Sequence, residues 1–253
     1  MQKEKYSRVP GHTRWVRISH WVITLAFLLL AFTGVEMLMV HPRLYWGETG
    51  NDLTPALFEL PVSRNYKHNG WTEPKAFFDK AGSPVSAGRT YDIFNQNGWG
   101  RSLHFLAGWL LVTTGLVYLF FGLFSGHFRR NILPARSELT GGNLRADIMR
   151  HLRMALPSAR GGPSYGLLQR ITYAGVVFFA LPLMVVTGFS MAPTITASFP
   201  FLLDIWGGYQ TARTIHFFAT IALFLFLFVH LFMVVRTGFR RQVSAMTTGN
   251  IHG

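Results

Sequence analysis

Apolar residues are gathered along the chain in four long blocks, and polar residues fill the stretches between them. The blocks run over about residues 18–40, 103–124, 167–191 and 214–236. Each is about 20 to 25 residues long, enough to cross about 30 Å of hydrocarbon as an α-helix. They lack the alternation of barrel strands, and backbone groups in lipid must be satisfied internally. The pattern therefore predicts an all-α integral membrane protein, a four-transmembrane-helix bundle that forms a single membrane domain over residues 1–253.

The polar connections between the blocks predict the orientation of the chain. The N-terminus, the stretch 126–170 and the C-terminus hold 16 of the 24 Lys and Arg residues, whereas residues 41–101 and 193–213 hold 8. Basic residues gather on the cytoplasmic side of membrane proteins. We therefore expect both termini in the cytoplasm, residues 41–101 as a long periplasmic loop, and a multi-pass protein of the bacterial inner membrane.

Composition supports this assignment and disfavours other classes. Charged residues make up 14% of the chain and hydrophobic residues 49%, against about 25% charged residues in a soluble domain. A soluble enzyme, a disordered tail and a nucleic-acid-binding protein are disfavoured, since basic cytoplasmic segments account for the net charge of +13. The chain has no cysteine, which excludes disulfides, thiolate chemistry and a cysteine-ligated iron–sulfur cluster within it.

Four of the ten histidines lie inside the apolar blocks, where ionisable residues are rare and mark functional sites. In the expected orientation, His104 and His216 lie near the outer face of the membrane, and His20 and His230 lie near the cytoplasmic face. His216 and His230 are fourteen residues apart. That separation is about 21 Å along a helix and nearly four whole turns, so both side chains share one helix face.

Each level therefore offers two imidazoles, and no carboxylate or thiolate accompanies them. Two facing imidazoles suit a six-coordinate b-type haem, whereas a zinc site would take three or four protein ligands. The sequence predicts two haem b groups, one bound by His104 and His216 and the other by His20 and His230.

Arginine and glycine residues near these histidines are candidates for haem contacts. Arginine precedes three of the histidines by one helical turn, where its guanidinium could hold a haem propionate. These arginines are Arg17, Arg101 and Arg213. Arg236, six residues after His230, is one further candidate. Glycines that could let a porphyrin approach the backbone are Gly34, Gly108 and Gly188. The plainer explanations are interface anchoring for the arginines and helix packing for the glycines.

Other interpretations of the intramembrane polar residues stay open. A haem-free transporter or proton channel would also use intramembrane histidines and Glu36, and it would show no haem absorbance. His41 and His127, at the ends of spans, are weaker rivals for the ligand positions.

Short motifs surround the histidines and close the spans. They are Arg17-Ile-Ser-His20-Trp21, Thr33-Gly34, Gly100-Arg101-Ser-Leu-His104, Thr187-Gly188, Ile215-His216, Val229-His230, Arg236-Thr-Gly238 and Met246-Thr-Thr-Gly249. With them the chain resembles the four-helix dihaem cytochrome b subunits of respiratory oxidoreductases. This bacterial cytochrome b561-like family includes the formate dehydrogenase gamma subunit, the thiosulfate reductase cytochrome b and the nickel–iron hydrogenase cytochrome b. The resemblance covers all four spans but not residues 41–101.

The resemblance implies a membrane subunit that anchors a periplasmic catalytic subunit and transfers electrons between it and the quinone pool. The partner would be a molybdenum or nickel–iron oxidoreductase, bound directly or through an iron–sulfur subunit. The quinone would bind near the inner haem at Tyr165, Gln169 and Arg170. These residues match the family's Tyr-Asn-x-x-Gln-Lys pattern, except that Gly166 replaces the asparagine and arginine replaces the lysine.

Two further features bear on the expected function, namely the lack of other catalytic motifs and the long loop. The sequence contains no hydrolase triad and no phosphate-binding loop, so we expect no catalysis on a small polar substrate beyond quinone chemistry. The aromatic residues of 41–101 would either dock the partner or form a self-packed cap.

Overall fold

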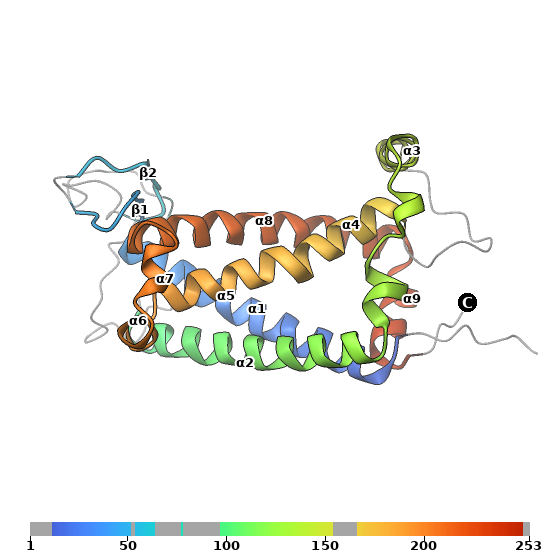
Figure 1. Ribbon diagram of the computed structural model, residues 1–253, viewed down its shortest axis with the longest axis horizontal. Helices are drawn as coiled ribbons and strands as arrows, with labels where there is room; N and C mark the ends of the chain where they lie inside the picture. Colours follow the sequence, from blue (N-terminus) through green and yellow to red (C-terminus); the bar gives the residue numbers. More distant parts are fainter. Residues whose placement is uncertain (1–11, 52–53, 64–76, 78–96, 154–165, 250–253) are drawn as a thin grey trace, which may run out of the picture. The chain divides into compact units, whose positions relative to one another are not determined.

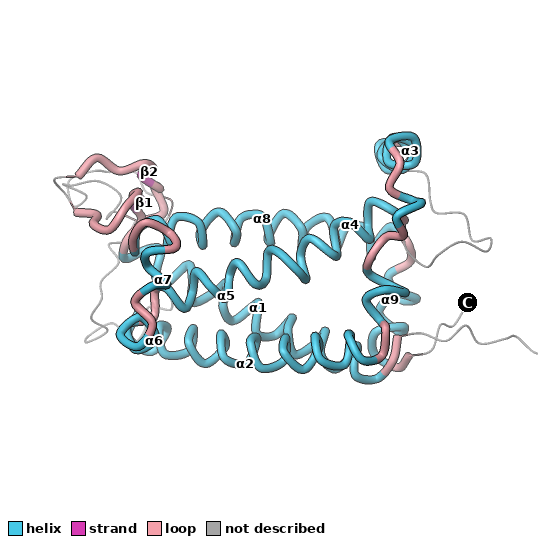
Figure 2. The backbone as a smooth tube through the Cα atoms, in the orientation of Figure 1, coloured by secondary structure: helices cyan, strands magenta, loops and turns pink. Residues whose placement is uncertain are grey.

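The computed structural model describes residues 12–51, 54–63, 77, 97–153 and 166–249. The described residues are mostly helical (Figures 1 and 2). Tyr165, one of the three expected quinone contacts, lies outside them, as does most of the loop 41–101.

Four helical segments are long and apolar enough to cross a membrane. They are α1 (Arg14–Val40), α2 (Asn97–Phe124), the run from α4 (Leu167–Gly175) to α5 (Leu181–Ser190), and α8 (Tyr209–Arg236). In each, only 6% to 22% of the most apolar stretch is buried inside the protein. Because so much apolar side-chain surface points outward, these helices need lipid around them. The chain is therefore a multi-pass membrane protein.

The third of these segments is interrupted at its middle. A π-helical turn over Val176–Ala180 joins α4 to α5, and Pro182 is the second residue after it. Proline lacks a backbone N–H and its ring presses on the carbonyl four residues earlier, so a wider turn relieves the conflict. The irregularity that Pro182 causes thus takes the form of one π turn.

The chain divides into two compact units. Unit 1 contains Met1–Trp21, Thr114–Leu181 and Leu223–Gly253, and unit 2 contains Val22–Thr113 and Pro182–Ala222. The smaller elements fall into one unit each. Unit 2 has a two-residue antiparallel pair, β1 (Arg43–Leu44) with β2 (Phe58–Glu59), and the short helices α6 (Pro193–Ser198) and α7 (Phe201–Asp204). Unit 1 has a π turn over Phe128–Ile132, a 3-10 turn over Arg136–Glu138, and the helices α3 (Gly141–Leu152) and α9 (Phe239–Thr247).

In unit 2, the segment that follows α1 caps the first turn of α8. The Gly47 carbonyl oxygen accepts hydrogen bonds from the backbone N–H groups of Gln210 and Thr211, at 3.0 and 3.2 Å. The Glu48 carboxylate accepts one from the Tyr209 N–H at 3.2 Å. The first N–H groups of a helix have no partner within it, and a carboxylate there also interacts favourably with the positive end of the helix dipole. The capping segment therefore fixes where α8 begins.

Several polar side chains are buried in this fold, while many large apolar ones are exposed. Among the described residues of the spans, the most deeply buried polar ones are Thr33, Glu36, Thr187, Ser190 and Thr214, each at most 1% exposed. Buried polar groups at membrane depth are costly unless they have partners, so they mark places where side chains interact specifically.

Candidate functional site

His104 of α2 is held by a threonine of α1, within unit 2. Its Nδ1 lies 2.8 Å from Thr33 Oγ1, and that hydroxyl also lies 2.7 Å from the Leu29 carbonyl oxygen. Threonines in helices often bond to the carbonyl four residues earlier. With Nδ1 engaged, Nε2 is the nitrogen of His104 that can bind a metal.

His216 of α8 is held in the same way by a threonine of α5. Its Nδ1 lies 2.8 Å from Thr187 Oγ1, which lies 2.7 Å from the Leu183 carbonyl oxygen. His104 and His216 are within electrostatic range of each other. Unit 2 thus brings together two of the four expected ligands, each fixed at the same ring nitrogen.

His20 of α1 and His230 of α8 face each other within unit 1. Their ring centroids are 6.4 Å apart and the rings are tilted by 50°. Aromatic rings border both: Trp21 meets His20 edge-on at 5.3 Å, Tyr173 meets His230 edge-on at 6.3 Å, and Phe226 stacks on His230 at 5.7 Å. The remaining two expected ligands therefore also form a pair.

The donor set of both pairs, and the spacing of His20 and His230, fit an iron porphyrin. Bonds from imidazole nitrogen to a metal such as zinc are about 2 Å long, so one ion between two imidazoles sets the ring centroids about 6 Å apart. The separation of His20 and His230 agrees with this value. In unit 2 the engaged Nδ1 atoms present Nε2 on both rings. No group of three or more His, Cys, Asp or Glu residues that could hold a metal ion occurs among the described residues, so the pairs would suit a group held by two imidazoles better than a zinc-type cluster.

The expected propionate partners in unit 2 differ in exposure. Arg213, half-buried, donates to the His41 carbonyl oxygen and, at 3.0 Å, to Gln210 Oε1. Arg101 is exposed and lies over the ring of Phe105 at 5.9 Å.

In unit 1, Arg17 contacts the C-terminal helix. Its guanidinium donates to the Thr247 carbonyl oxygen at 2.6 Å, and Trp21 Nε1 donates to the Met246 carbonyl oxygen at 2.9 Å. The end of α9 therefore holds two residues that flank His20. Arg236 is exposed at the last turn of α8.

The expected glycines lie in two kinds of place. A Cβ added to Gly34 would lie 3.9 Å from His104 Cε1, and one added to Gly188 would lie 3.6 Å from His216 Cε1. A Cβ added to Gly108 would meet no described atom within 4 Å. Gly34 and Gly188 thus border the histidine rings, and Gly108 borders open space.

The expected quinone contacts of α4 have partners of their own. Gln169 Nε2 donates to the Tyr173 hydroxyl at 2.7 Å, and the Tyr173 ring lies edge-on to His230. The guanidinium of Arg170, which is 6% exposed, donates to Glu138 Oε2 at 2.8 Å and to the Leu133 carbonyl oxygen.

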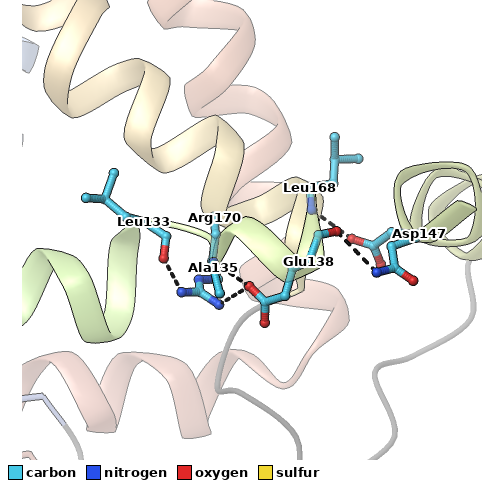
Figure 3. A network of polar contacts seen from close by, with 7 residues as sticks. Leu133, Ala135, Glu138, Asp147, Leu168 and Arg170 are labelled. Atoms are coloured by element: carbon cyan, nitrogen blue, oxygen red, sulfur yellow. Dashed lines mark hydrogen bonds and ion pairs between the residues drawn. The ribbon is translucent and has the colours of Figure 1, made fainter. Parts of the chain in front are cut away.

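The same network fixes the start of α4 (Figure 3). Glu138 Oε2 also accepts from the Ala135 N–H at 2.8 Å, and Asp147 Oδ2 accepts from the Leu168 N–H at 2.8 Å. Asp147 therefore caps α4 from the neighbouring α3. Arg170 is thus part of this structural network, whereas Gln169 contacts Tyr173, whose ring lies beside His230.

Of the two rival histidines, His127 has side-chain partners outside both pairs, and His41 is contacted at its backbone. In unit 1, His127 Nδ1 lies 3.1 Å from Asn131 Nδ2, and its Nε2 lies 3.4 Å from the Tyr118 hydroxyl. Partial burial, and then the charges of His12 and Arg130, lower the pKa of His127. In unit 2, the backbone carbonyl of His41 receives Arg213.

Paired histidines among four apolar helices define the class: a membrane protein equipped to bind haem. Residues 11–249 match the family model described as "Prokaryotic cytochrome b561", so the chain belongs to this family. The resemblance to cytochrome b561-like subunits is thereby confirmed, and the chain is a membrane electron-transfer subunit that binds haem b. This favours haem over the transporter or channel alternative.

A curated relative aligns with nearly all of the chain. It is a "Putative protein-methionine-sulfoxide reductase subunit YedZ1" of Azospira oryzae, 28% identical over 250 residues, which are 99% of this chain and 100% of the relative. No solved structure matches the chain.

Sequence reasoning assigned no role to three kinds of contact that the structure contains. These are the threonine hydroxyls at the histidine rings, Tyr173 beside His230, and the hold of α9 on Arg17 and Trp21. One sequence signal was available: the dipeptide Thr-Gly occurs in three spans, at Thr33, Thr114 and Thr187. The first and third of these threonines lie at histidine rings.

Proposed function

We propose that this chain is a dihaem b subunit that transfers electrons between a periplasmic oxidoreductase, which it anchors, and the quinone pool of the bacterial inner membrane. The observation that carries the proposal is that the four intramembrane histidines fall into two pairs, each within one unit. His20 and His230 face each other, and His104 and His216 are within electrostatic range, each with Nδ1 held by a threonine. Haem b, when bound, takes up and releases single electrons.

Each pair would hold one haem by its own set of residues. His104 and His216 would ligate one iron, with Arg101 and Arg213 near the propionates and Gly34, Gly108 and Gly188 near the porphyrin. His20 and His230 would ligate the other, with Arg17 and Arg236 as propionate partners. Guanidinium groups retain their charge whether exposed, as in Arg101 and Arg236, or half-buried, as in Arg17 and Arg213, and they can hold carboxylates with paired hydrogen bonds.

The quinone would bind beside His230, at the start of α4. Tyr165, Gln169 and Arg170 are the proposed contacts, and the hydrogen bond from Gln169 to Tyr173 supports a polar path from this site to His230. Arg170, tied to Glu138, would act mainly by holding α4 in place. With both termini in the cytoplasm, the quinone would exchange protons with that side.

The partner would bind on the periplasmic side, where we place residues 41–101. A molybdenum or nickel–iron oxidoreductase, bound directly or through an iron–sulfur subunit, is one class of partner. The relative's name adds protein-methionine-sulfoxide reductase as another. Reducing a sulfoxide to a thioether consumes electrons and protons and releases water, so with that partner electrons would flow from quinol outward.

Haem counting tests the proposal. A pyridine haemochrome assay on the purified chain should give two b haems, and each of His20→Ala, His104→Ala, His216→Ala and His230→Ala should remove one. The matched control is His127→Ala, which changes a partnered histidine outside both pairs and should leave two. A colourless wild-type protein, prepared with full haem supply, would contradict the proposal.

The quinone and partner steps need separate measurements. In proteoliposomes, a quinol analogue should reduce the bound haem, and Gln169→Leu should slow this reduction while the haem count stays at two. Affinity purification from the native membrane should recover an oxidoreductase with the chain. Recovery of haem with no partner and no quinol reactivity would limit the function to haem binding.

A further inference from the structure

We propose that Thr33 and Thr187 act as paired hydrogen-bond acceptors that fix the tautomer of His104 and His216 and lower the midpoint potential of the haem these histidines hold. The proposal rests on the proposed function, because it assigns that haem to this pair. It adds two positioning residues that touch the ligands and not the iron.

The two threonines share one geometry on two different helices. Thr33 Oγ1 lies 2.7 and 3.3 Å from the carbonyl oxygens of Leu29 and Leu30. Thr187 Oγ1 lies 2.7 and 3.2 Å from those of Leu183 and Met184. Both side chains are 0% exposed. The arrangement is thus repeated in α1 and α5, each time against a histidine of the neighbouring span.

Counting protons assigns the direction of each contact. A threonine hydroxyl has one proton to donate, and a neutral imidazole has one N–H. An oxygen pair 2.7 Å apart is favourable only with a proton between them, so each hydroxyl donates to the carbonyl four residues earlier. The 2.8 Å contact to the ring then requires that the histidine Nδ1–H donates to the threonine oxygen. Both rings therefore have Nε2 unprotonated and available as the metal ligand.

The glycine after each threonine leaves room for the histidine ring. A Cβ at Gly34 would lie 3.9 Å from His104 Cε1, and a Cβ at Gly188 would lie 3.6 Å from His216 Cε1. Each ring is therefore held at Nδ1 by the hydroxyl and rests beside a residue without a side chain. Two neighbouring positions in each helix thus set both the orientation of the ring and its tautomer.

The hydrogen bond also changes the electron density on the ligand. A metal-bound histidine that donates its other N–H to an acceptor becomes a more basic ligand. The threonine oxygen is a better acceptor because it donates its own proton to a carbonyl. A more basic imidazole stabilises ferric over ferrous iron, so the two bonds lower the midpoint potential.

Redox titration of the haem absorbance tests this effect. Thr33→Val and Thr187→Val keep the side-chain shape and remove the oxygen. Each should raise the midpoint potential of one haem, by about a two- to tenfold shift in the ferric-to-ferrous ratio, tenfold being about 59 mV for one electron. The other haem should keep its potential. Thr33→Ser and Thr187→Ser, which restore the hydroxyl, should return the potential toward the wild-type value.

The matched control is Thr172→Val. Thr172 of α4 makes the same back-bond, to the Leu168 carbonyl oxygen at 2.8 Å, but it is exposed and belongs to unit 1. This change should leave both potentials unchanged. Unchanged potentials in both valine variants would overturn the proposal, as would serine variants that behave like valine or equal shifts of both haems.

A second measurement covers valine variants that lose haem. Nitrogen NMR of 15N-histidine in the haem-free wild-type chain, with His104→Gln and His216→Gln for assignment, reports the tautomer directly. Protonated Nδ1 on both rings supports the proposal, and protonated Nε2 overturns it. If His216→Ala instead leaves the haem count unchanged, the proposed function fails at this pair. The proposed effect of the threonines on the midpoint potential is then also wrong, and the NMR result tests only the proposed tautomer.

Discussion

The histidine pair of unit 2 and the histidine pair of unit 1 are positioned by different kinds of contact. In unit 2, buried threonines within the spans bind the rings of His104 and His216 at Nδ1. In unit 1, aromatic rings border His20 and His230, and the end of α9 holds Arg17 and Trp21 beside His20. The comparison teaches that one pair is oriented from inside the helices, whereas the other depends on a segment that follows the last span.

Removing α9 should have the largest effect, because it should remove haem from one histidine pair and not from the other. A chain that ends at Gly238 loses the carbonyl oxygens that receive Arg17 and Trp21. We expect the His20–His230 pair to lose most of its haem, so the pyridine haemochrome count should fall from two toward one. The haem that stays should disappear when His216→Ala is added. Equal loss from both pairs, or no loss, would contradict the assigned role of α9.

A glycine substitution tests the capping segment of unit 2. Gly208 has φ +124°, and a Cβ there would come 2.5 Å from the Gly47 backbone, in the segment that caps α8. Gly208→Ala should destabilise the protein by about 2–4 kcal/mol, lowering the thermal midpoint in detergent. Gly207→Ala is the matched control, since Gly207 has φ +70° but no described atom within 4 Å. The control should cost about 1–2 kcal/mol; equal losses would show that the capping contact is unimportant.

Neutralising Glu138 tests the network that fixes α4 in unit 1. Glu138→Gln keeps an acceptor for the Arg170 guanidinium but removes the charge that pairs with it. Because Glu138 is partly exposed, we expect a loss of only about 1–2 kcal/mol, measured as a lower thermal midpoint. Glu59→Gln, on exposed β2 of unit 2, should change stability by less than about 0.5 kcal/mol. A similar loss in both variants would remove the structural role of the ion pair.

The smallest expected effect comes from one hydrogen bond of Trp21. Trp21→Phe keeps the ring contact with His20 and removes the indole N–H that donates to the Met246 carbonyl oxygen. We expect a loss of about 0.5–1.5 kcal/mol, together with a small shift in the potential of one haem only. Trp46→Phe, at an indole that is 62% exposed in unit 2, serves as the control and should change neither quantity. A shift of both haems would mean that Trp21 does not act locally.

Sequence reasoning reached the fold class and the family because both depend on local patterns. An apolar block of about 20 residues has few alternatives to a spanning helix, and four blocks gave four such helices. The pairing of the histidines was inferred from depth alone. Depth follows from helix rise, so the partner of His20 could be predicted before any contact between α1 and α8 was known.

The contacts that orient the histidines could not be derived in this way. His104 and Thr33 are 71 residues apart in sequence, and Arg17 and Thr247 are 230 apart. Nor did sequence predict that Arg170 is committed to Glu138, since a basic residue near a span end has many possible partners. Such contacts depend on helix rotation, which hydrophobic periodicity barely constrains when most of each apolar face is turned toward lipid.

By itself the sequence determined four spans, the residue types that can bind iron, and their depth along each helix, because hydrophobicity and helix rise are properties of consecutive residues. Only the tertiary structure decided which hydroxyl contacts which imidazole, which backbone carbonyl oxygens accept from Arg17 and Trp21, and which segment caps α8. The physical reason is that a hydrogen bond between distant residues requires two helices to be rotated and set in register to within a fraction of an ångström. That alignment arises from the packing of several segments together.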